Sequence, residues 1–360
     1  MNDDIDRMIE TFEAAIRDKA DYAIRLVDLG SLVAAKDAKV KALELARKAL
    51  EVGRGDPQVA VRAGKLLAKL IPGYHVPMMN DARRNAAWDA ALRRAIRPGM
   101  RVFEIGTGAG MLAMMAARAG STNVVTCETN EVAAVLAREL VARNGLADRI
   151  RILTKPSQEV TVGADLEGPA DLLFCDIFGD ALFRFSPLPA LADARRRLLA
   201  PGAPSIPAGG MLRAALAYWP EYGRLAHIET ACDFDLRPMS NFARTLVAID
   251  IGDPGLRLAS RPQDLFCFDF AEDSYANEGR AEIVCKAEAD GVVNGISCWI
   301  KLVLDAQTTL EARPEPGAKF FSRTKFAPLP EPLTLRSGDE LRVAAAYNGN
   351  ELDVWLAGKI

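Results

Sequence analysis

A turn that holds three glycines constrains the fold of this chain more than any other feature of its sequence. A short apolar run, 101–105, precedes the turn, and a second apolar run, 123–127, follows it and ends just before Glu128. Between them, 111–119 is rich in Ala, Met and Leu at the spacing of an amphipathic helix. The glycines stand on alternate positions: Gly106, Gly108 and Gly110. Strand, glycine turn, helix and strand in this order predict half of a doubly wound, Rossmann-like α/β domain that binds a nucleotide.

Two acids beside the turn indicate which nucleotide is bound. Glu128 lies about 20 residues beyond the turn, where a carboxylate accepts both hydroxyls of a ribose. A dinucleotide fingerprint needs a glycine where this chain has Met111. Glu104 would repel a phosphate but would attract the ammonium of an amino-acid moiety. Because S-adenosylmethionine has a ribose, a cationic amino-acid tail and no phosphate, we expect it to be the cofactor. Its expected contacts at the turn are Glu104, Gly106, Gly108, Gly110 and Glu128.

Composition excludes several other classes of protein. The net charge of −3 over 360 residues gives no general attraction to nucleic acid. No apolar run approaches the roughly 18 residues that a membrane span needs, and the acidic start, 1–6, differs from the basic start of a signal peptide. The six cysteines form no C-x-x-C pair, and there are two histidines. We therefore expect a cytoplasmic protein with reduced cysteines in its core, no metal site, and no nucleic-acid or membrane partner.

Three patterns along the chain predict three regions. Residues 5–70 show helical periodicity and resemble tetratricopeptide hairpins, which favours either a module that binds a protein partner or a helical cap on the next domain. Strand and helix patterns alternate from 101 to about 205, and short strands separated by Gly, Pro, Asn and Asp follow. The expected architecture is an α-helical region over 1–73, a Rossmann-like domain over 74–207 and an antiparallel β domain, sandwich or barrel, over 208–360.

The segment 75–88, HVPMMNDARRNAAW, is similar to the opening helix of the protein arginine methyltransferases, whose pattern is H-x-x-M-x-x-D-x-x-R-[TN]-x-x-[YW]. Together with the order of the regions, it makes residues 74–360 resemble that family, which combines a class I methyltransferase fold with a β barrel. The resemblance implies that Arg84 pairs with the carboxylate of the cofactor. It also implies that Met78 packs beside the sulfonium and that His75 lies near the cofactor.

Later segments extend the resemblance. Ser157 and Gln158 stand where the family contacts adenine, through the backbone of the first residue and the side chain of the second. The segment 234–242 resembles part of the family's dimerisation arm, which would lie near 220–245 and would make the protein a homodimer.

The part of the site that would hold the methyl acceptor, here called the acceptor half, departs from the family pattern. The family holds the substrate guanidinium with two glutamates on the loop after the fourth strand. Here Asp176 takes the first position and Phe185 the second, and Phe320 and Phe321 stand where the family has a Thr-His-Trp loop. A buried guanidinium would lose one of its two partners. The resemblance therefore implies an apolar acceptor pocket lined by Phe185, Phe320 and Phe321.

These residues indicate a methyltransferase with a rebuilt acceptor site. The sulfonium is already an activated donor, so the protein mainly aligns the acceptor and excludes water. A base is needed if the acceptor keeps its proton, and the candidates are Asp176, Asp180 and His75. We expect an S-adenosylmethionine-dependent enzyme that acts on a non-standard N or O acceptor in a small molecule or peptide. The alternatives are methylation of arginine, free or in a protein, and a non-catalytic dimeric scaffold that holds a protein partner through 5–70.

Overall fold

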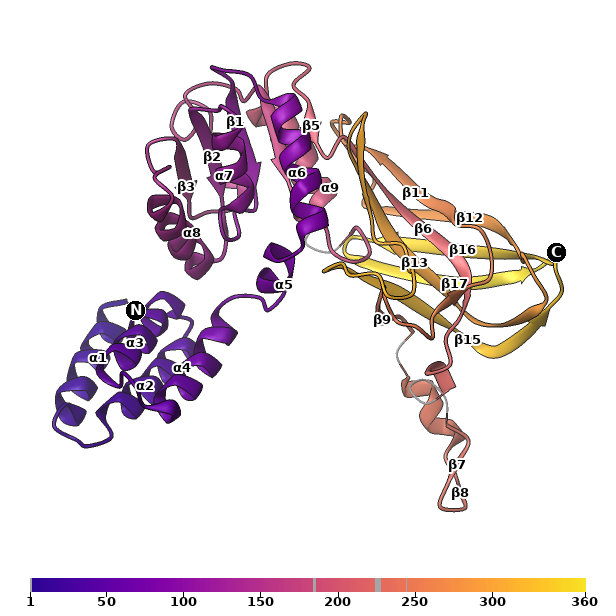
Figure 1. Cartoon of the computed structure of the whole chain (residues 1–360), viewed down its shortest axis with the longest axis horizontal. Coiled ribbons are helices and arrows are strands. Elements are labelled where there is room, and N and C mark those ends of the chain that lie inside the picture. The colour runs from indigo at the N-terminus through magenta and orange to yellow at the C-terminus, as the bar shows by residue number, and fades with distance from the viewer. Residues whose placement is uncertain (1, 184–185, 224–227, 244) are drawn as a thin grey trace.

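Four helices at the N-terminus form a bundle with its own apolar core. The computed structural model describes residues 2–183, 186–223, 228–243 and 245–360 (Figure 1). The helices of the bundle are α1 (Asn2–Ile16), α2 (Tyr22–Ala35), α3 (Lys39–Val52) and α4 (Pro57–Leu70). The start of α4 follows from its sequence, because Asp56 accepts a hydrogen bond from the backbone N of Gln58 and Pro57 occupies the first turn. Within the described ranges, no helix is both long and apolar enough to cross a membrane.

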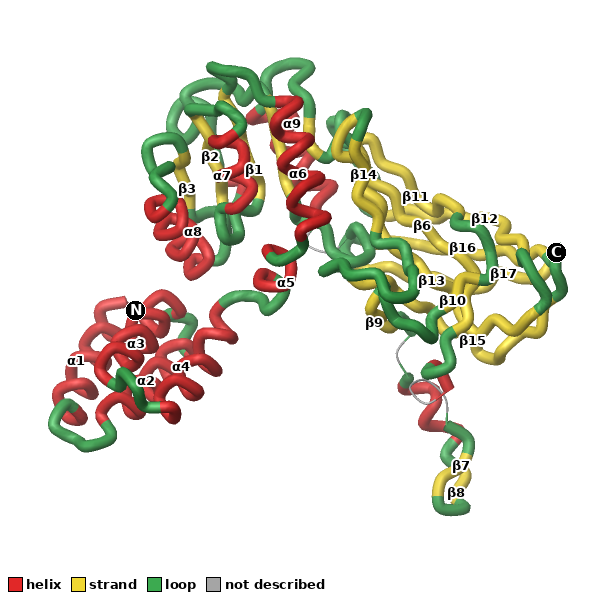
Figure 2. Tube along the Cα trace, viewed as in Figure 1, coloured by secondary structure: helices red, strands yellow, loops and turns green. Residues whose placement is uncertain are grey.

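The second part is a five-stranded parallel sheet with the order β3-β2-β1-β4-β5 (Figure 2). Its strands are β1 (Arg101–Ile105), β2 (Asn123–Cys127), β3 (Ile150–Leu153), β4 (Leu172–Cys175) and β5 (Ser205–Ile206). Its helices are α5 (His75–Met79), α6 (Ala82–Ala95), α7 (Met111–Arg118), α8 (Glu131–Arg143) and α9 (Pro187–Leu198). The strand order changes direction between β1 and β4, and the carboxyl ends of strands at such a switch point are where α/β proteins bind ligands.

The bundle is packed against this second part through α8. Val132 is buried in the same apolar cluster as the bundle core. The guanidinium of Arg47 binds both carboxylate oxygens of Glu139, at 2.6 and 2.7 Å. At the end of α4, the carbonyl of Leu70 accepts a hydrogen bond from the side chain of Asn130. The bundle therefore covers one helix of the α/β domain, and its resemblance to tetratricopeptide hairpins stays a prediction.

The third part is an antiparallel, barrel-like β domain. One sheet has the order β10-β6-β13-β15-β9, with β11 on β6 and β14 on β13, and a second sheet has the order β12-β16-β17. The strands are β6 (Gly209–Tyr218), β9 (Val247–Asp250), β10 (Arg257–Leu258), β11 (Gln263–Asp269), β12 (Glu278–Lys286), β13 (Gly291–Asp305), β14 (Thr308–Glu311), β15 (Arg323–Leu335), β16 (Glu340–Asn348) and β17 (Glu351–Lys359). The predicted order of helices, α/β domain and β domain is confirmed.

A narrow arm projects from the β domain, away from the rest of the molecule (Figure 1). It contains the hairpin of β7 (Thr230–Ala231) and β8 (Phe234–Asp235), followed by the short helix η2 (Arg237–Phe242). Three large apolar side chains on it are exposed, Phe234 at 69%, Met239 at 57% and Phe242 at 82%. This arm lies in the region 220–245 where the sequence resembles a dimerisation arm.

Candidate active site

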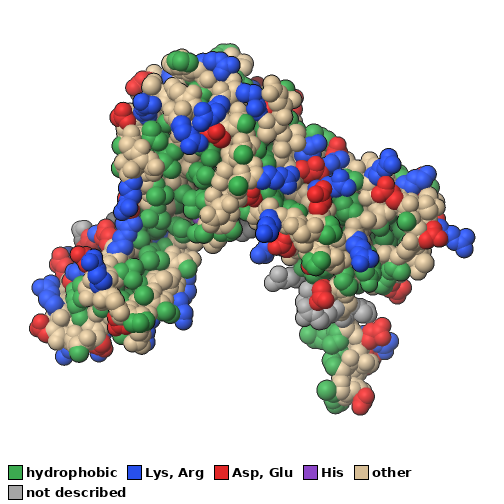
Figure 3. Space-filling view, in the orientation of Figure 1, with side chains coloured by type: hydrophobic (Ala, Val, Ile, Leu, Met, Phe, Trp, Pro, Cys, Tyr) green, Lys and Arg blue, Asp and Glu red, His purple; other side chains and the backbone are tan. Residues whose placement is uncertain are grey.

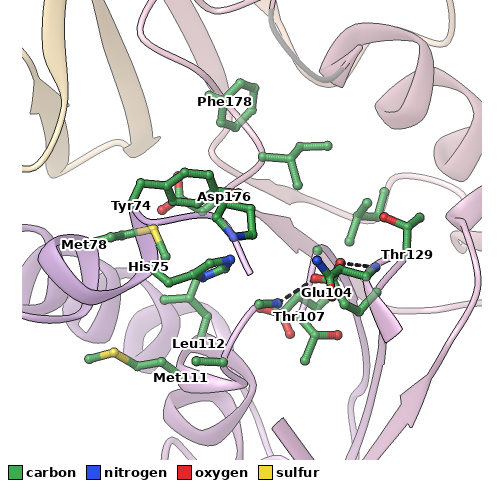
Figure 4. A pocket seen from close by; sticks show the side chains of 18 of the residues that line it. Tyr74, His75, Met78, Glu104, Thr107, Met111, Leu112, Thr129, Asp176 and Phe178 are labelled. Carbon is green, nitrogen blue, oxygen red and sulfur yellow. Dashed lines mark hydrogen bonds between the residues drawn. The ribbon is translucent and has the colours of Figure 1, made fainter. Parts of the chain in front are cut away.

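A cavity of about 740 Å³ opens at the carboxyl ends of β1, β2 and β4, under α5 and a loop of the β domain (Figure 4). Most of the predicted site residues line it: His75, Met78, Arg84, Glu104, Gly106, Gly108, Glu128, Ser157, Gln158, Asp176, Asp180 and Phe321. The structure therefore brings together residues that lie far apart in the sequence. Ser157 and Gln158 reach it from a short helix after β3, η1 (Ser157–Glu159).

The glycine turn lines the cavity, and two of its glycines leave space where a side chain would not fit. Gly106 and Gly108 have φ angles of +86° and +52°. A Cβ on Gly106 would lie 2.5 Å from Cγ2 of Ile177, and one on Gly108 would lie 3.2 Å from Cε1 of His75. Both positions therefore require glycine, for their backbone angles and for their lack of space.

Gly110, also predicted to bind the cofactor, lies outside the cavity lining. It has a φ of +78° and caps the start of α7. A Cβ on it would lie 3.4 Å from Val141 and 3.5 Å from Ala137, both on α8. The third glycine thus permits a turn and a close contact between helices.

Glu128 is fixed at the cavity wall by two backbone N–H groups. Its Oε2 accepts a hydrogen bond from the N of Gly108 at 2.9 Å, and its Oε1 accepts one from the N of Asn130 at 2.8 Å. Each carboxylate oxygen can accept further bonds. The geometry therefore presents a pre-oriented pair of acceptors beside the glycine turn.

Glu104 is a buried acid with one unsatisfied oxygen. The residue is 1% exposed, and its Oε2 has no hydrogen-bond partner in the described part of the chain. Burial raises the pKa of Glu104 to about 8, against the smaller opposing effects of Thr126 and Arg84. The carboxyl group therefore carries a proton at pH 7 and would lose it beside a cation.

Arg84 and Asp176 form a buried ion pair. The Nε and Nη2 atoms of Arg84 lie 2.7 and 2.5 Å from Oδ2 of Asp176, and the side chains are 3% and 10% exposed. Arg84 is held by the start of α6, where Asp81 accepts a hydrogen bond from its backbone N, and by Oδ1 of Asn85, which accepts from Nη1 at 2.9 Å. The predicted carboxylate-binding cation and the first candidate base are thus partners of each other.

His75 is buried and lies against the glycine turn. It is 7% exposed, its Nδ1 has no hydrogen-bond partner among the described residues, and its ring stacks on Tyr74 at 4.7 Å. Burial lowers the pKa of His75, against a raising effect of Glu128, so the ring is neutral at pH 7.

A loop of the β domain closes the acceptor side. The ring of Phe321 lies 5.8 Å from Cζ of Arg84, and its backbone N donates to Oδ2 of Asp81 at 2.9 Å. Phe320 instead stacks with Arg83 at 5.3 Å and is absent from the cavity lining. Phe185 lies outside the residues that the structure describes.

Asp180 holds the same loop and is itself ion-paired. Its Oδ1 accepts hydrogen bonds from the hydroxyl of Ser322 and the backbone N of Arg323, at 3.3 and 3.2 Å. Its Oδ2 lies 3.3 Å from Nζ of Lys325. Both candidate carboxylate bases therefore already have cationic partners.

Among the residues at the site that were not predicted from the sequence, Asp81 and Arg323 connect it to the β domain. Asp81 links α6 to the β-domain loop, and its position three residues before Arg84 was a signal for a helix cap. Arg323 lines the cavity from the start of β15, and no local motif marks it, because only the tertiary fold brings it there. No cluster of three or more potential metal ligands occurs among the residues for which the structure gives positions.

Comparison with known proteins identifies relatives of this chain. Residues 90–209 match the family of ribosomal protein L11 methyltransferase (PrmA). The arginine N(omega)-methyltransferase of Streptomyces achromogenes subsp. streptozoticus is 32% identical over 285 residues, which cover 79% of this chain and 78% of the relative. Protein arginine N-methyltransferase 7 of Oryza sativa subsp. indica is 31% identical over 255 residues, and this chain spans only 35% of its length.

Solved structures share the fold at lower identity. The Trypanosoma brucei PRMT1 enzyme–prozyme heterotetrameric complex with AdoHcy superposes with a TM-score of 0.70 and 21% identity, over 78% of this chain and 91% of that one. Arabidopsis thaliana protein arginine methyltransferase 10 superposes with a TM-score of 0.64 and 17% identity, over 80% and 97%. The predicted cofactor, S-adenosylmethionine, is confirmed by these relatives. The chain belongs to the arginine N-methyltransferase family and is a class I S-adenosylmethionine-dependent methyltransferase.

Proposed function

We propose that this protein methylates a guanidino nitrogen of arginine. The observation that carries the proposal is the position of Asp176, which occupies the family's first acid position and lies buried beside Arg84 in the cavity. A carboxylate at this place can hold a guanidinium by paired hydrogen bonds. The name of the Streptomyces relative, an arginine N(omega)-methyltransferase, supports the same acceptor.

Three charged side chains would hold S-adenosylmethionine. Glu128 presents two oriented oxygens for the ribose hydroxyls, and the unsatisfied Oε2 of Glu104 suits the ammonium. Arg84 would bind the carboxylate, and the glycine turn leaves space for the adenosine. Ser157 and Gln158 would contact the adenine, and Met78 and His75 would lie beside the sulfonium. The bound cofactor supplies a methyl group on an activated sulfonium.

The chain's own residues then align the acceptor and remove a proton. Asp176 orients the guanidinium so that one nitrogen lone pair points towards the methyl carbon. Asp176 also accepts the proton released when the new N–C bond forms, and Asp180 is the second candidate for this role. The ring of Phe321 keeps water from the reacting atoms. His75 is the weaker base candidate, because burial lowers its pKa and it lies against the glycine turn.

A second candidate is a non-standard N or O acceptor in a small molecule or peptide. It is favoured by the ring of Phe321 in the cavity and by the pairing of both Asp176 and Asp180 with cations. An uncharged acceptor would not need a carboxylate as its counter-charge, so Asp176 and Asp180 could both stay paired with their cations.

The test is methyl transfer from labelled S-adenosylmethionine, with products identified by mass spectrometry. We expect methylated arginine and a loss of kcat of about 100-fold or more in Asp176→Asn, with cofactor binding retained. The control is Asp193→Asn, an acid of α9 paired with Arg197 outside the cavity. Methylation of amines or hydroxyl compounds without methylation of any guanidino compound would favour the second candidate instead.

We also propose that the protein is a cytoplasmic homodimer joined through the arm. The exposed apolar side chains of the arm support a contact with a second copy. The six free cysteines support a reducing compartment, although Cys232 and Cys267 are exposed, which corrects the expectation that all six lie in the core. A protein partner held by 5–70 stays a prediction, and the bundle's outer surface carries the exposed Leu32 and Val61 for it.

A further inference from the structure

We propose that Arg323 is a specificity-determining residue that binds the carboxylate of a free amino-acid acceptor. This inference rests on the proposed function and narrows its substrate to free arginine, because the main-chain carboxyl group of an arginine inside a protein is an uncharged amide. Nothing in the sequence around Arg323 indicates such a role, and the inference comes from its place and its surroundings in the fold.

Arg323 is fixed at the acceptor side of the cavity by its backbone. It begins β15, directly after the loop that carries Phe321, and its N donates to Oδ1 of Asp180. The preceding residue, Ser322, donates its hydroxyl to the same oxygen. Because Asp180 belongs to the loop after β4, these bonds hold the start of β15 beside the loop that begins with Asp176.

Of the lysines and arginines that line the cavity, Arg323 is the one whose side chain has no protein partner among the described residues. Arg84 is paired with Asp176, and Lys155 lies 2.6 Å from Asp165. Arg323 is exposed and lines the cavity, and within residues 2–183, 186–223, 228–243 and 245–360 no hydrogen bond or ion pair to its side chain occurs.

Two acids that lie beside the backbone of Arg323 already accept hydrogen bonds. Asp180 binds the Arg323 backbone and Lys325 through its two oxygens. Asp250, opposite Arg323 on β9, accepts a hydrogen bond from the N of Gly252 at 2.9 Å. A planar guanidinium with free donors matches a carboxylate, to which it binds through two parallel hydrogen bonds.

An acid and a cation therefore line the acceptor side from different elements. Asp176 follows β4, and Arg323 begins β15 with no side-chain partner in the described part of the chain. Free arginine has the matching layout, with a guanidinium at one end and a carboxylate at the other.

The test compares L-arginine with agmatine, which is arginine without its carboxylate, in methyl transfer and in calorimetry on the protein saturated with S-adenosylhomocysteine. We expect Arg323→Gln to raise the KM and the Kd for L-arginine by about 10- to 100-fold, with kcat changed little. The same variant should leave the KM and the Kd for agmatine unchanged, both of which we expect to be high. Arg323→Lys should restore part of the affinity for L-arginine. Arg336→Gln, an exposed arginine of the β domain away from the cavity, is the matched control.

Two results would overturn the inference. One is wild-type protein that binds agmatine or an arginine peptide as well as L-arginine. The other is an Arg323→Gln variant with wild-type affinity for L-arginine. Either can occur while guanidino compounds are methylated, in which case the proposed function stands. Tight, Arg323-dependent binding of L-arginine without its methylation would instead refute the proposed function and leave the carboxylate site in place.

Discussion

We expect Glu104 to link cofactor binding to the release of a proton. Its pKa of about 8, caused mainly by burial, means that the free protein holds this group neutral at pH 7. The ammonium of S-adenosylmethionine would lower that pKa and displace the proton. Because a group must lose a proton for binding, cofactor affinity should rise as the pH increases from 6 to 8 and level off above 8.

Calorimetry in buffers of different ionisation enthalpy measures this proton directly. At pH 7 we expect close to one proton to be released per cofactor bound, and none from this site in Glu104→Gln. The variant should also lose the rise in affinity between pH 6 and 8. A wild-type protein that binds S-adenosylmethionine at pH 7 without proton release would place the ammonium elsewhere.

The burial of Glu104 also predicts how the stability of the protein depends on pH. Stability should change with pH in the opposite direction to cofactor affinity. The unfolded carboxyl titrates near its ordinary value of 4.5, and the folded one near 8, so between these values the folded state binds more protons. Stability of the cofactor-free protein should therefore fall as the pH rises from about 5 to 8. Thermal unfolding of Glu104→Gln should show a smaller fall over this range, and equal slopes for the two proteins would contradict the assignment.

In the proposed mode of cofactor binding, the cofactor carboxylate and Asp176 would compete for the guanidinium of Arg84. When the cofactor carboxylate binds Arg84, Asp176 must share or leave its partner, with which it is buried. Asp176→Asn removes the competing charge, and we expect it to bind S-adenosylhomocysteine about 3- to 10-fold more tightly. Asp180→Asn, which changes an acid paired with Lys325, should leave this Kd unchanged. Weaker binding by Asp176→Asn would mean that Asp176 only positions Arg84.

Among the elements, the N-terminal bundle is connected to the cofactor site by a short chain of contacts. The carbonyl of Leu70 accepts from Asn130, whose backbone N donates to Glu128. Asn130 also caps α8 through the N of Ala133. The polypeptide also runs directly from α4 into α5, which carries His75. The bundle thus contacts Asn130, which holds Glu128, and leads directly into α5.

Removal of residues 1–70 should therefore weaken cofactor binding as well as stability. It would expose the apolar face of α8 around Val132, whose burial is worth about 1.5–3 kcal/mol per side chain. We expect a lower Tm and a loss of cofactor affinity of about 10-fold or more. The control is Leu32→Ser with Val61→Ser, two exposed sites on the bundle. A truncated protein with unchanged affinity would make the bundle an independent module for a partner.

Local patterns in the sequence were sufficient to predict most helices and the parallel strands, because each has a clear hydrophobic period or a helix cap. Pro57, for example, marks the start of α4, and the run before the glycine turn is β1. The periodicity of the sequence does not mark most of the strand β15, because Pro328, Pro330 and Pro332 interrupt it and proline normally argues against a strand. The pairing register shifts along this stretch, which accommodates prolines that cannot donate to the neighbouring strand.

The acceptor half of the site was less predictable from sequence for a physical reason. Glu104, Gly106 and Glu128 line the cavity from β1, from the glycine turn and from the residue after β2, all of which the local sequence pattern predicts. Arg323 and Phe321, in contrast, reach the cavity only after the β domain folds against α6 and the loop after β4. No local period records such a contact, so Arg323 was missed and Phe320 was placed in a pocket that it does not line.

At the scale of the whole molecule, the bundle and the arm project from the same side. The space-filling view shows a wide hollow between them (Figure 3). The arm ends in exposed apolar residues that a monomer would leave in water, namely Phe234, Met239 and Phe242. A stable interface buries about 800 Å² on each partner and concentrates its energy in aromatic anchors. The arm offers such anchors, and a second copy is the partner that the family resemblance implies.

We expect the triple variant Phe234→Ser, Met239→Ser and Phe242→Ser to be a folded monomer where the wild-type protein is a dimer. Light scattering coupled to size-exclusion chromatography, over a range of concentrations, measures the mass of each. The control variant, Val284→Ser with Val292→Ser, changes exposed apolar residues of the β domain, at 45% and 42% exposure, and should remain a dimer. Loss of one aromatic anchor costs about 2 kcal/mol, so Phe242→Ser alone should weaken association about 30-fold. A triple variant with wild-type mass, or a wild-type monomer at every concentration, would show that the arm does not join two copies.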